Sequence, residues 1–452
     1  MIAVLVVLAG VAVLFYIFHI LFFWIFPSTD SIFYWLLSDF FKTGIYLAPH
    51  PYYYREPSTM EPPLYSVFIF IANLFPRADI IIHIIQVAAI IASGILIYKI
   101  QNHSFSKKYA LLSAVLFLFT PAHLIYISNM VAESLAVFYI SLFLYFLHLA
   151  VNLRNKKILP IMLVYSALIS LHRYNLVTFF LLTLFLIFRE KGKLMSRYLG
   201  LSASLAVFGG WILLNHQWNG SWGLSNSEGK HLYNRILHFD RILPPNTHPS
   251  FIKFRQLAGE RDDYFKPWWF YEEALITSTG SETKASLIMQ EFALAALISN
   301  PLKYIINTPK FFLFAHWDNP TYHDDLYLYG GNMKNNCGKS GNIFFCRPII
   351  KTEYAFKFWD ALVILVDFIY LNLAKFFNIF LLFPALIYAI LKKDRFFRYV
   401  SLLYIASITL FVMVEAPLPR YTYIFTPIPV ILVTYFSINI PRKIFVKKIR
   451  NG

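Results

Sequence analysis

The chain has 452 residues, of which 58% are hydrophobic and only 14% are charged. A soluble domain carries about 25% charged residues, so this composition excludes an ordinary soluble protein and indicates one that crosses a membrane several times. The formal net charge is +16, but most Lys and Arg residues lie in short loops between apolar runs. That placement is typical of membrane orientation signals and argues against a nucleic-acid-binding protein.

Repeated apolar runs approach the length of about 20 residues that a membrane-spanning helix needs. The first run has no basic n-region and no small-residue cleavage site, so it is interpreted as a retained anchor. The sequence therefore predicts an all-α polytopic membrane protein with about ten transmembrane helices, within a range of about nine to twelve. The predicted spans are residues 3–26, 80–99, 109–128, 134–151, 158–172, 174–188, 198–214, 368–391, 399–414 and 420–439.

The basic loops predict the orientation of these spans. With the N-terminus in the cytoplasm, every basic loop falls on the cytoplasmic side, as the positive-inside rule requires. Residues 62–75 are apolar but too short for a confident span, so they are interpreted as a re-entrant or interfacial helix on the outer side. The basic loops carry Lys107 and Lys108, Arg154 and Lys156, Arg189, Arg395, and the tail from Arg442 to Arg450.

This topology predicts four parts. Residues 1–214 form an N-terminal transmembrane module with its first outer loop at 27–79, and residues 215–355 form a mixed extracytoplasmic segment or small domain. Residues 356–441 form a C-terminal transmembrane module, and residues 442–452 form a basic cytoplasmic tail.

Three features of the extracytoplasmic segment are expected. Residues 300–317 read as an amphipathic helix lying on the membrane. Cys337 and Cys346 are predicted to form a disulfide on an oxidising face, with two free thiols as the alternative. His316 and His323 are interpreted as surface polar residues, because no His, Asp or Glu set has clear metal-ligand spacing.

Asp30 lies about one helical turn beyond the first span, on the outer face. A carboxylate at mid-membrane costs about 2.5–3.5 kcal/mol, and less near the interface, so an acid kept there is a candidate for chemistry. The alternative is that Asp30 only caps a short helix beginning near Ile32. Both interpretations stay open at this point.

Three further charged residues stand at outer span ends, and each has a simpler structural explanation. Glu133 also suits the first turn of a helix, where the helix dipole stabilises an acid. Arg173 also suits an interfacial position with its head group in water. Arg420 can bind a phosphate through two hydrogen bonds or merely anchor the last span. Together with Asp30 they predict an outer site suited to a ligand with an apolar tail and a phosphate.

Four local patterns follow one another in the chain, and their order resembles that of the GT-C glycosyltransferases. The closest branch contains the protein O-mannosyltransferases and the lipid A aminoarabinose transferases. The resemblance covers about the first 190 and the last 60 residues and says little about residues 215–355. The patterns are Asp30 with Tyr34-Trp35, Pro62-Pro63-Leu64-Tyr65, Ala132-Glu133, and Arg420-Tyr421 with Pro427-Ile428-Pro429.

The resemblance implies an inverting glycosyltransferase of GT-C type. It would move a sugar from a polyprenyl- or dolichyl-phosphate donor to a hydroxyl of a protein, lipid or glycan. The reaction would take place on the extracytoplasmic face of a bacterial inner membrane, a plasma membrane or an endoplasmic reticulum membrane. The sequence requires no cofactor and leaves a divalent metal open.

The resemblance also implies roles for individual residues. Asp30 would be the general base, and Glu133 would position the acceptor or a metal. The donor phosphate would be bound by Arg420, Arg173 and Arg55, and the groove would be lined by Tyr34, Trp35, Tyr65 and Tyr421.

Two positions depart from the family pattern. Ser31 stands where a second acid often follows the first, and Glu61 stands where a basic residue often precedes Pro-Pro-Leu. Because of both departures, the family's donor-phosphate contacts cannot be assigned directly to these positions. Glu61 in particular would repel a phosphate.

Two other classes of function are retained as alternatives: a transporter or flippase of lipid-linked sugars, and a non-enzymatic membrane scaffold. Transporters usually show inverted repeats and charged sites near the bilayer midplane, and the sequence displays neither. Geometry distinguishes the three, because only the enzyme predicts that Asp30, Glu133 and Arg420 converge around one outer cavity.

Overall fold

The computed structural model describes residues 10–12, 14, 16, 29–46, 57–120, 122–128, 130–189, 194–260, 263–317, 375–392, 394–415 and 420–450. All regular structure within these ranges is helical, and no β-strand occurs there. The prediction of an all-α chain is thus confirmed for this part. The described part of the segment after residue 215 is helical too, rather than mixed.

The helices fall into three groups along the chain. The first group comprises α2 (Thr29–Thr43), α3 (Pro63–Ala72), α4 (Ala78–Ser104), α5 (Lys107–Leu118), α6 (Ala122–Ser128), α7 (Glu133–Val151), α8 (Leu159–Ser170), α9 (Val177–Arg189) and α10 (Leu194–Asn219). The second comprises α11 (Glu228–Tyr233), η3 (Asn234–Phe239), α12 (Pro249–Ala258), α13 (Trp269–Thr279), α14 (Glu282–Ser299) and α15 (Pro301–Trp317). The third comprises α18 (Lys375–Phe377), η6 (Asn378–Leu382), α19 (Phe383–Leu391), α20 (Arg395–Val414), α21 (Arg420–Tyr423) and α22 (Pro427–Arg450).

Four of the described helices, α4, α7, α10 and α20, are long and apolar enough to cross a membrane. A fifth span results if α14 and α15, which meet at an angle of 101°, count as one. The predicted number of about ten spans therefore stays a prediction. As expected, residues 62–75 contain only the short helix α3.

Two predicted spans are interrupted, and prolines account for both breaks. Residues 109–128 form α5 and α6 instead of one helix, and Pro121 stands between them in the sequence. The last span is divided into α21 and α22, which begins at Pro427. Proline lacks the N–H of a helix interior and disfavours helical geometry in the preceding residue, so a helix ends before it.

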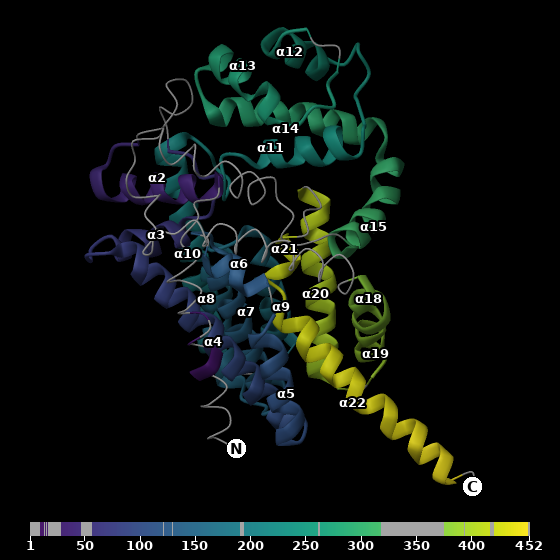
Figure 1. The fold of residues 1–452 in the computed structure, drawn as a ribbon. Helices are drawn as coiled ribbons and strands as arrows, with labels where there is room; N and C mark the ends of the chain where they lie inside the picture. Colours follow the sequence, from purple (N-terminus) through teal and green to yellow (C-terminus); the bar gives the residue numbers. More distant parts are fainter. Residues whose placement is uncertain are drawn as a thin grey trace, which may run out of the picture.

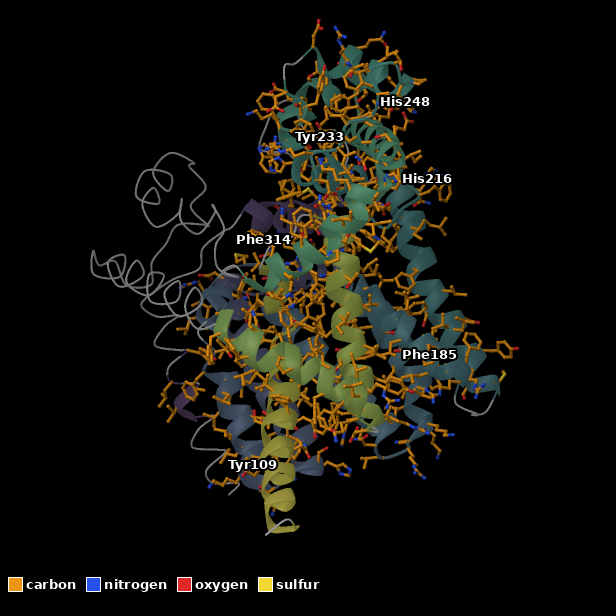
Figure 2. All side chains as sticks on the ribbon, turned by 90° about the vertical axis from the view of Figure 1, so that its right-hand side faces the viewer. Tyr109, Phe185, His216, Tyr233, His248 and Phe314 are labelled. Atoms are coloured by element: carbon orange, nitrogen blue, oxygen red, sulfur yellow. The ribbon has the colours of Figure 1, made fainter. Side chains whose placement is uncertain are left out.

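The bundle has two distinct ends (Figure 1). Helices α2 and α3 and the four helices α11–α14, here called the cap helices, gather at one end, the capped end. Helix α5 and the last turns of α22 reach the opposite end, called here the basic end. Tyr109 marks the basic end in Figure 2, and Tyr233 and His248 mark the cap helices.

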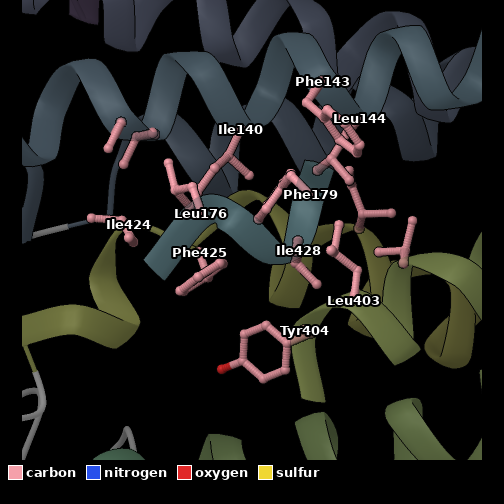
Figure 3. Packing of buried hydrophobic residues seen from close by; sticks show 14 of the residues in the cluster. Ile140, Phe143, Leu144, Leu176, Phe179, Leu403, Tyr404, Ile424, Phe425 and Ile428 are labelled. Carbon is pink, nitrogen blue, oxygen red and sulfur yellow. The ribbon is translucent and has the colours of Figure 1, made fainter. Parts of the chain in front are cut away.

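One hydrophobic core joins helices from both ends of the sequence (Figure 3). Phe143 of α7 meets Phe179 of α9 edge to face, with ring centroids 4.7 Å apart. Phe179 in turn stacks with Phe425, which precedes α22, at 6.2 Å. All three side chains are buried. The N-terminal and C-terminal helices are therefore parts of one bundle.

The cap helices have a separate core built around aromatic rings. Phe254 of α12 stacks on Phe292 of α14 at 4.4 Å, and Tyr233 stacks on Phe254 at 5.6 Å. Beside this core, the ammonium group of Lys230 is buried and contacts the carboxylates of Glu272 and Glu282, each at 2.5 Å. The pairing offsets the cost of burying the three charges.

Side chains of the second helix group hold the C-terminal turn of α20. Arg235 is fully buried, pairs with Asp240 and donates from Nε to the carbonyl oxygen of Val412. The hydroxyl of Tyr304 donates to the carbonyl oxygen of Met413 at 2.6 Å. The last carbonyls of a helix have no partner within it, so these bonds satisfy them and fasten η3 and α15 to α20.

Replacing Arg235 should destabilise the protein severely. Arg235→Met leaves the carboxylate of Asp240 buried without its counter-charge and Val412 without its donor. Removing one partner of a buried ion pair costs about 3–5 kcal/mol. Thermal unfolding of purified protein in detergent measures the effect.

The matched control is Arg255→Met. Arg255 pairs with Glu260 on the surface, where the two side chains are 48% and 75% exposed, and such pairs contribute about 0–1 kcal/mol. Equal losses of stability in the two variants would contradict the role given to Arg235.

Candidate functional site

The capped end contains a buried ion pair at the start of α7. Glu133 is the first residue of this helix, and Arg173 precedes the turn η2 (Tyr174–Leu176). Their side chains form a salt bridge, and the two residues are only 1% and 6% exposed. Arg173 therefore does not extend into water, which was the simpler explanation of its position. The second carboxylate oxygen of Glu133, Oε2, has no hydrogen-bond partner among the described residues.

Aromatic residues of α2 and α3 lie next to this pair. Tyr34 and Tyr65 are both buried and meet edge to face at 4.8 Å. The hydroxyl of Tyr34 donates to Oε2 of Glu61 at 2.7 Å, and that of Tyr65 donates to Oε1 of Gln86 at 3.4 Å. Trp35 is half-buried against the same cluster. Three of the predicted groove residues are thus brought together.

Helix α2 begins at Thr29, so Asp30 lies in its first turn and not ahead of a helix that starts near Ile32. The hydroxyl of Ser31 donates to the carbonyl oxygen of Met130 at 2.9 Å. This bond holds the first turn of α2 against the segment that leads into α7, three residues before Glu133. The side chain of Asp30 lies outside the described part of the structure.

Helix α21, which begins at Arg420, packs beside α6. The rings of Tyr423 and Tyr126 stack at 4.0 Å, and the hydroxyl of Tyr423 is hydrogen-bonded to Nδ1 of His123 at 2.7 Å. Helix α6 also contacts the start of the bundle helices α4 and α7, so α21 is joined to them through α6. The side chains of Arg420 and Tyr421 lie outside the described residues, as do Arg55, Cys337 and Cys346 entirely.

The end of the first outer loop is fixed by amide side chains. The backbone N–H of Thr59 donates to Oδ1 of Asn226 at 3.0 Å, and its hydroxyl donates to Oδ1 of Asn215 at 2.7 Å. Nδ2 of Asn219 donates to the carbonyl oxygen of Pro57 at 3.1 Å. These bonds attach residues 57–59 to the end of α10 and to the segment that follows it.

The cap helices contribute a further ion pair at this end. Nδ1 of His231 lies 3.2 Å from the Oε1 atom of Glu415, which follows α20. Burial by itself lowers the pKa of His231, but Glu415 and, more weakly, Glu61 raise it, and the net direction is upward. His231 therefore keeps its positive charge at pH values above the ordinary pKa of histidine.

Several residues of this end carry no clear signal in the sequence. Glu61 was noted only as a departure from a family pattern, and His231 gave no signal. Nε2 of His172 bonds the carbonyl oxygen of Ala132 at 2.7 Å, and its position beside Arg173 was the available hint. The interpretation of His316 as a surface residue was wrong, since it is buried and its Nε2 bonds the hydroxyl of Tyr404 at 2.8 Å.

Within the residues that the structure describes, no three His, Cys, Asp or Glu side chains are grouped so that they could hold a metal ion. Glu133 stands with Arg173 instead of a second carboxylate, and a guanidinium is not a metal ligand.

Residues 60–213 match the family model of the dolichyl-phosphate-mannose-protein mannosyltransferases. The matched part extends from the start of α3 into α10 and includes Tyr65, Glu133 and Arg173. The resemblance inferred from local patterns is therefore confirmed over this part of the chain. No curated protein matches the sequence significantly.

Among solved structures, the chain is similar to the oligosaccharyltransferase of Archaeoglobus fulgidus in its apo form. The sequence identity is 13% and the TM-score 0.46, over 98% of this chain and 51% of the other. The chain thus spans about half the length of that protein. At this identity and TM-score, the similarity says nothing about activity.

A double-mutant cycle tests the coupling of Glu133 and Arg173. Glu133→Gln and Arg173→Met should each destabilise the protein by about 3–5 kcal/mol, because each leaves a buried charge unpaired. The double variant leaves neither charge and should lose less than the sum, by about 0.5–3 kcal/mol. Denaturant unfolding in detergent gives the free energy of unfolding of the wild type, both single variants and the double variant. Additive losses of stability would show that the two side chains act independently.

The ion pair of His231 and Glu415 predicts that the stability of the folded protein depends on pH. Because the pKa of His231 is raised in the folded protein, the pair stabilises fully below about pH 6.5, the ordinary value. This contribution is lost as pH rises through the raised pKa. His231→Gln should lower the melting temperature by about 1–3 °C at about pH 6 and leave it unchanged at about pH 9. An equal effect at both values would mean that charge on His231 plays no part.

Proposed function

We propose, from the match of residues 60–213 to the mannosyltransferase family model, that this chain is an integral-membrane glycosyltransferase. It takes a sugar from a polyprenyl- or dolichyl-phosphate donor and transfers it to an acceptor hydroxyl at the capped end. The observation that carries the proposal is the buried pair of Glu133 and Arg173, which lies in the matched part beside the first turn of α2.

In this reaction Asp30 is the general base. Its carboxylate takes the proton of the acceptor hydroxyl while the hydroxyl oxygen bonds to the anomeric carbon of the sugar. The bond from that carbon to the phosphate oxygen breaks, and the polyprenyl phosphate leaves with the bonding electrons. Attack from the face opposite the leaving group inverts the anomeric configuration. A positioned general base contributes about 10²–10⁴-fold to the rate.

Arginine stabilises the charge that develops on the leaving phosphate. A guanidinium has five N–H donors, so Arg173 can keep its bond to Glu133 and still donate to a phosphate. In this role Glu133 fixes the position of Arg173 and presents its second oxygen to the acceptor. Arg420 and Arg55 are the other proposed phosphate ligands. Donors that are fixed before the reaction are worth more than mobile ones, because they need no rearrangement in the transition state.

Tyr34, Trp35, Tyr65 and Tyr421 are proposed to line the groove for the isoprenoid tail and the sugar. Burial of Tyr34 and Tyr65 and their edge-to-face contact support a rigid wall. The capped end is proposed to face the extracytoplasmic side, with transmembrane modules at 1–214 and 356–441 and an outer segment at 215–355. The acceptor is a protein, a lipid or a glycan. The transporter and scaffold alternatives give the gathered acid, arginine and tyrosines no shared role.

The proposal is tested by sugar transfer from a panel of labelled polyprenyl-phosphate sugars in membranes that contain the protein. Asp30→Asn keeps the shape of the side chain and removes the base, so transfer should fall by at least about 100-fold at equal expression. The matched control is Asp39→Asn, the same change two turns later in the same helix α2, which should retain wild-type activity.

Two results would contradict the assignment. Equal transfer by wild type and Asp30→Asn would leave Asp30 as a first-turn helix residue and make Glu133 the next candidate for the base. No transfer by wild type with any donor of the panel would overturn the glycosyltransferase itself.

A further inference from the structure

A cavity lies at the basic end, far from the ion pair of Glu133 and Arg173. It has a volume of about 960 Å³. Its walls come from the C-terminal ends of α4, α7 and α9, the starts of α8 and α20, and the middle of α22, so six α-helices contribute to it. No step of the proposed sugar transfer uses it.

The charged side chains of this cavity are mostly cationic. Arg154, Lys156 and Arg395 line it together with one carboxylate, that of Asp394. Asp394 caps α20 and accepts the backbone N–H groups of Phe396 and Phe397 at 3.0 and 3.3 Å. Within the described ranges, neither Arg154 nor Arg395 forms a salt bridge. Two exposed guanidinium groups thus line one cavity, whose described lining contains a single carboxylate, that of Asp394.

Part of the remaining lining is apolar and lies beside polar residues such as His103, Asn152 and Asn439. The rings of Phe397 and Tyr435 stack at 3.8 Å, and Phe105 lies 6.2 Å from Phe397. Leu159 and Leu186 complete this side. A cavity with cations from loops on one side and aromatic and aliphatic groups on the other matches a ligand that is itself amphipathic.

Arg154 has an unusual backbone conformation, with a φ of +52°. Residues other than glycine rarely adopt this left-handed region. The turn is held by the backbone bonds from Asn155 N–H to the carbonyl oxygen of Leu149 and from Lys156 N–H to that of Arg154, both at 3.0 Å. The turn therefore gives Arg154 a fixed place at the cavity.

Membrane orientation alone does not explain this arrangement. The positive-inside rule requires basic residues in the loops, but it requires no cavity between them. Lys107 and Lys108 fulfil the rule at the same end of the bundle, exposed at the start of α5 and outside the cavity lining. They serve as an internal comparison for Arg154 and Arg395.

We propose that this cavity binds the phosphate group of an anionic membrane lipid from the leaflet at the basic end. Arg154, Lys156 and Arg395 contact the phosphate, and the wall of Phe105, Phe397 and Tyr435 contacts the start of the acyl chains. Arginine suits this task because its planar donor group matches phosphate oxygens in pairs. A free phosphate ion shares the charged part of this chemistry but gains nothing from the apolar wall.

Native mass spectrometry of the full chain in a neutral detergent tests the proposal. Phosphatidylglycerol is titrated and bound lipid is counted, with phosphatidylcholine and inorganic phosphate as comparison probes. Each cation near an anionic lipid is worth about fivefold in affinity, so Arg154→Gln with Arg395→Gln should weaken phosphatidylglycerol binding about 30-fold. Lys107→Gln with Lys108→Gln removes the same charge from the same end and should leave binding unchanged. All four substituted residues are exposed, and the melting temperatures of both double variants are measured alongside.

The lipid site is supported if phosphatidylglycerol binding weakens only in the Arg154→Gln, Arg395→Gln variant and inorganic phosphate competes poorly. Equal weakening in both double variants would overturn it, because the effect would then come from the basic surface as a whole. Competition by inorganic phosphate as strong as that by phosphatidylglycerol would overturn the lipid assignment and leave a site for a soluble phosphate. Because the readout is lipid binding, it is independent of sugar transfer.

Discussion

The buried salt bridge between Glu133 and Arg173 is the constraint on which the capped end depends. Two charges without access to water must stay together, since separating them costs several kcal/mol. The pair joins the start of α7 to the turn before α9, and the bonds from Ser31 to Met130 and from the Leu64 N–H to Leu171 add α2 and α3 to the same junction. Four segments that are distant in the sequence are thereby held around one acid and one arginine.

The second helix group is attached to the bundle at the end of α20. Arg235 and Tyr304 satisfy the terminal carbonyls of α20, and His231 reaches Glu415 just beyond it. Because hydrogen bonds and ion pairs are directional, they fix the cap helices relative to α20 more closely than apolar contact would. The helices above α7 are therefore held in a defined position relative to α20.

The two ends of the bundle use charge in different ways. At the capped end, Glu133 and Arg173 neutralise each other and are buried, so they organise the protein around them. At the basic end, Arg154 and Arg395 are exposed and lack a described salt bridge, so their charge is available to a ligand. A membrane protein meets phosphate groups at both of its surfaces, and arginine serves for either because its guanidinium stays charged in every setting.

The sequence by itself determined the properties that depend on local composition. Apolar runs indicated the helical character, and the short patterns around Tyr65 and Glu133 lie in residues 60–213, which match the mannosyltransferase family model. The tertiary structure decided what depends on partners far along the chain: that Arg173 faces Glu133, that His316 is buried against Tyr404, and that Arg154 and Arg395 line one cavity. Hydropathy reports the preference of a side chain for water or lipid, but a buried charge is stable only beside a particular partner. That partner is fixed by the packing of the whole bundle.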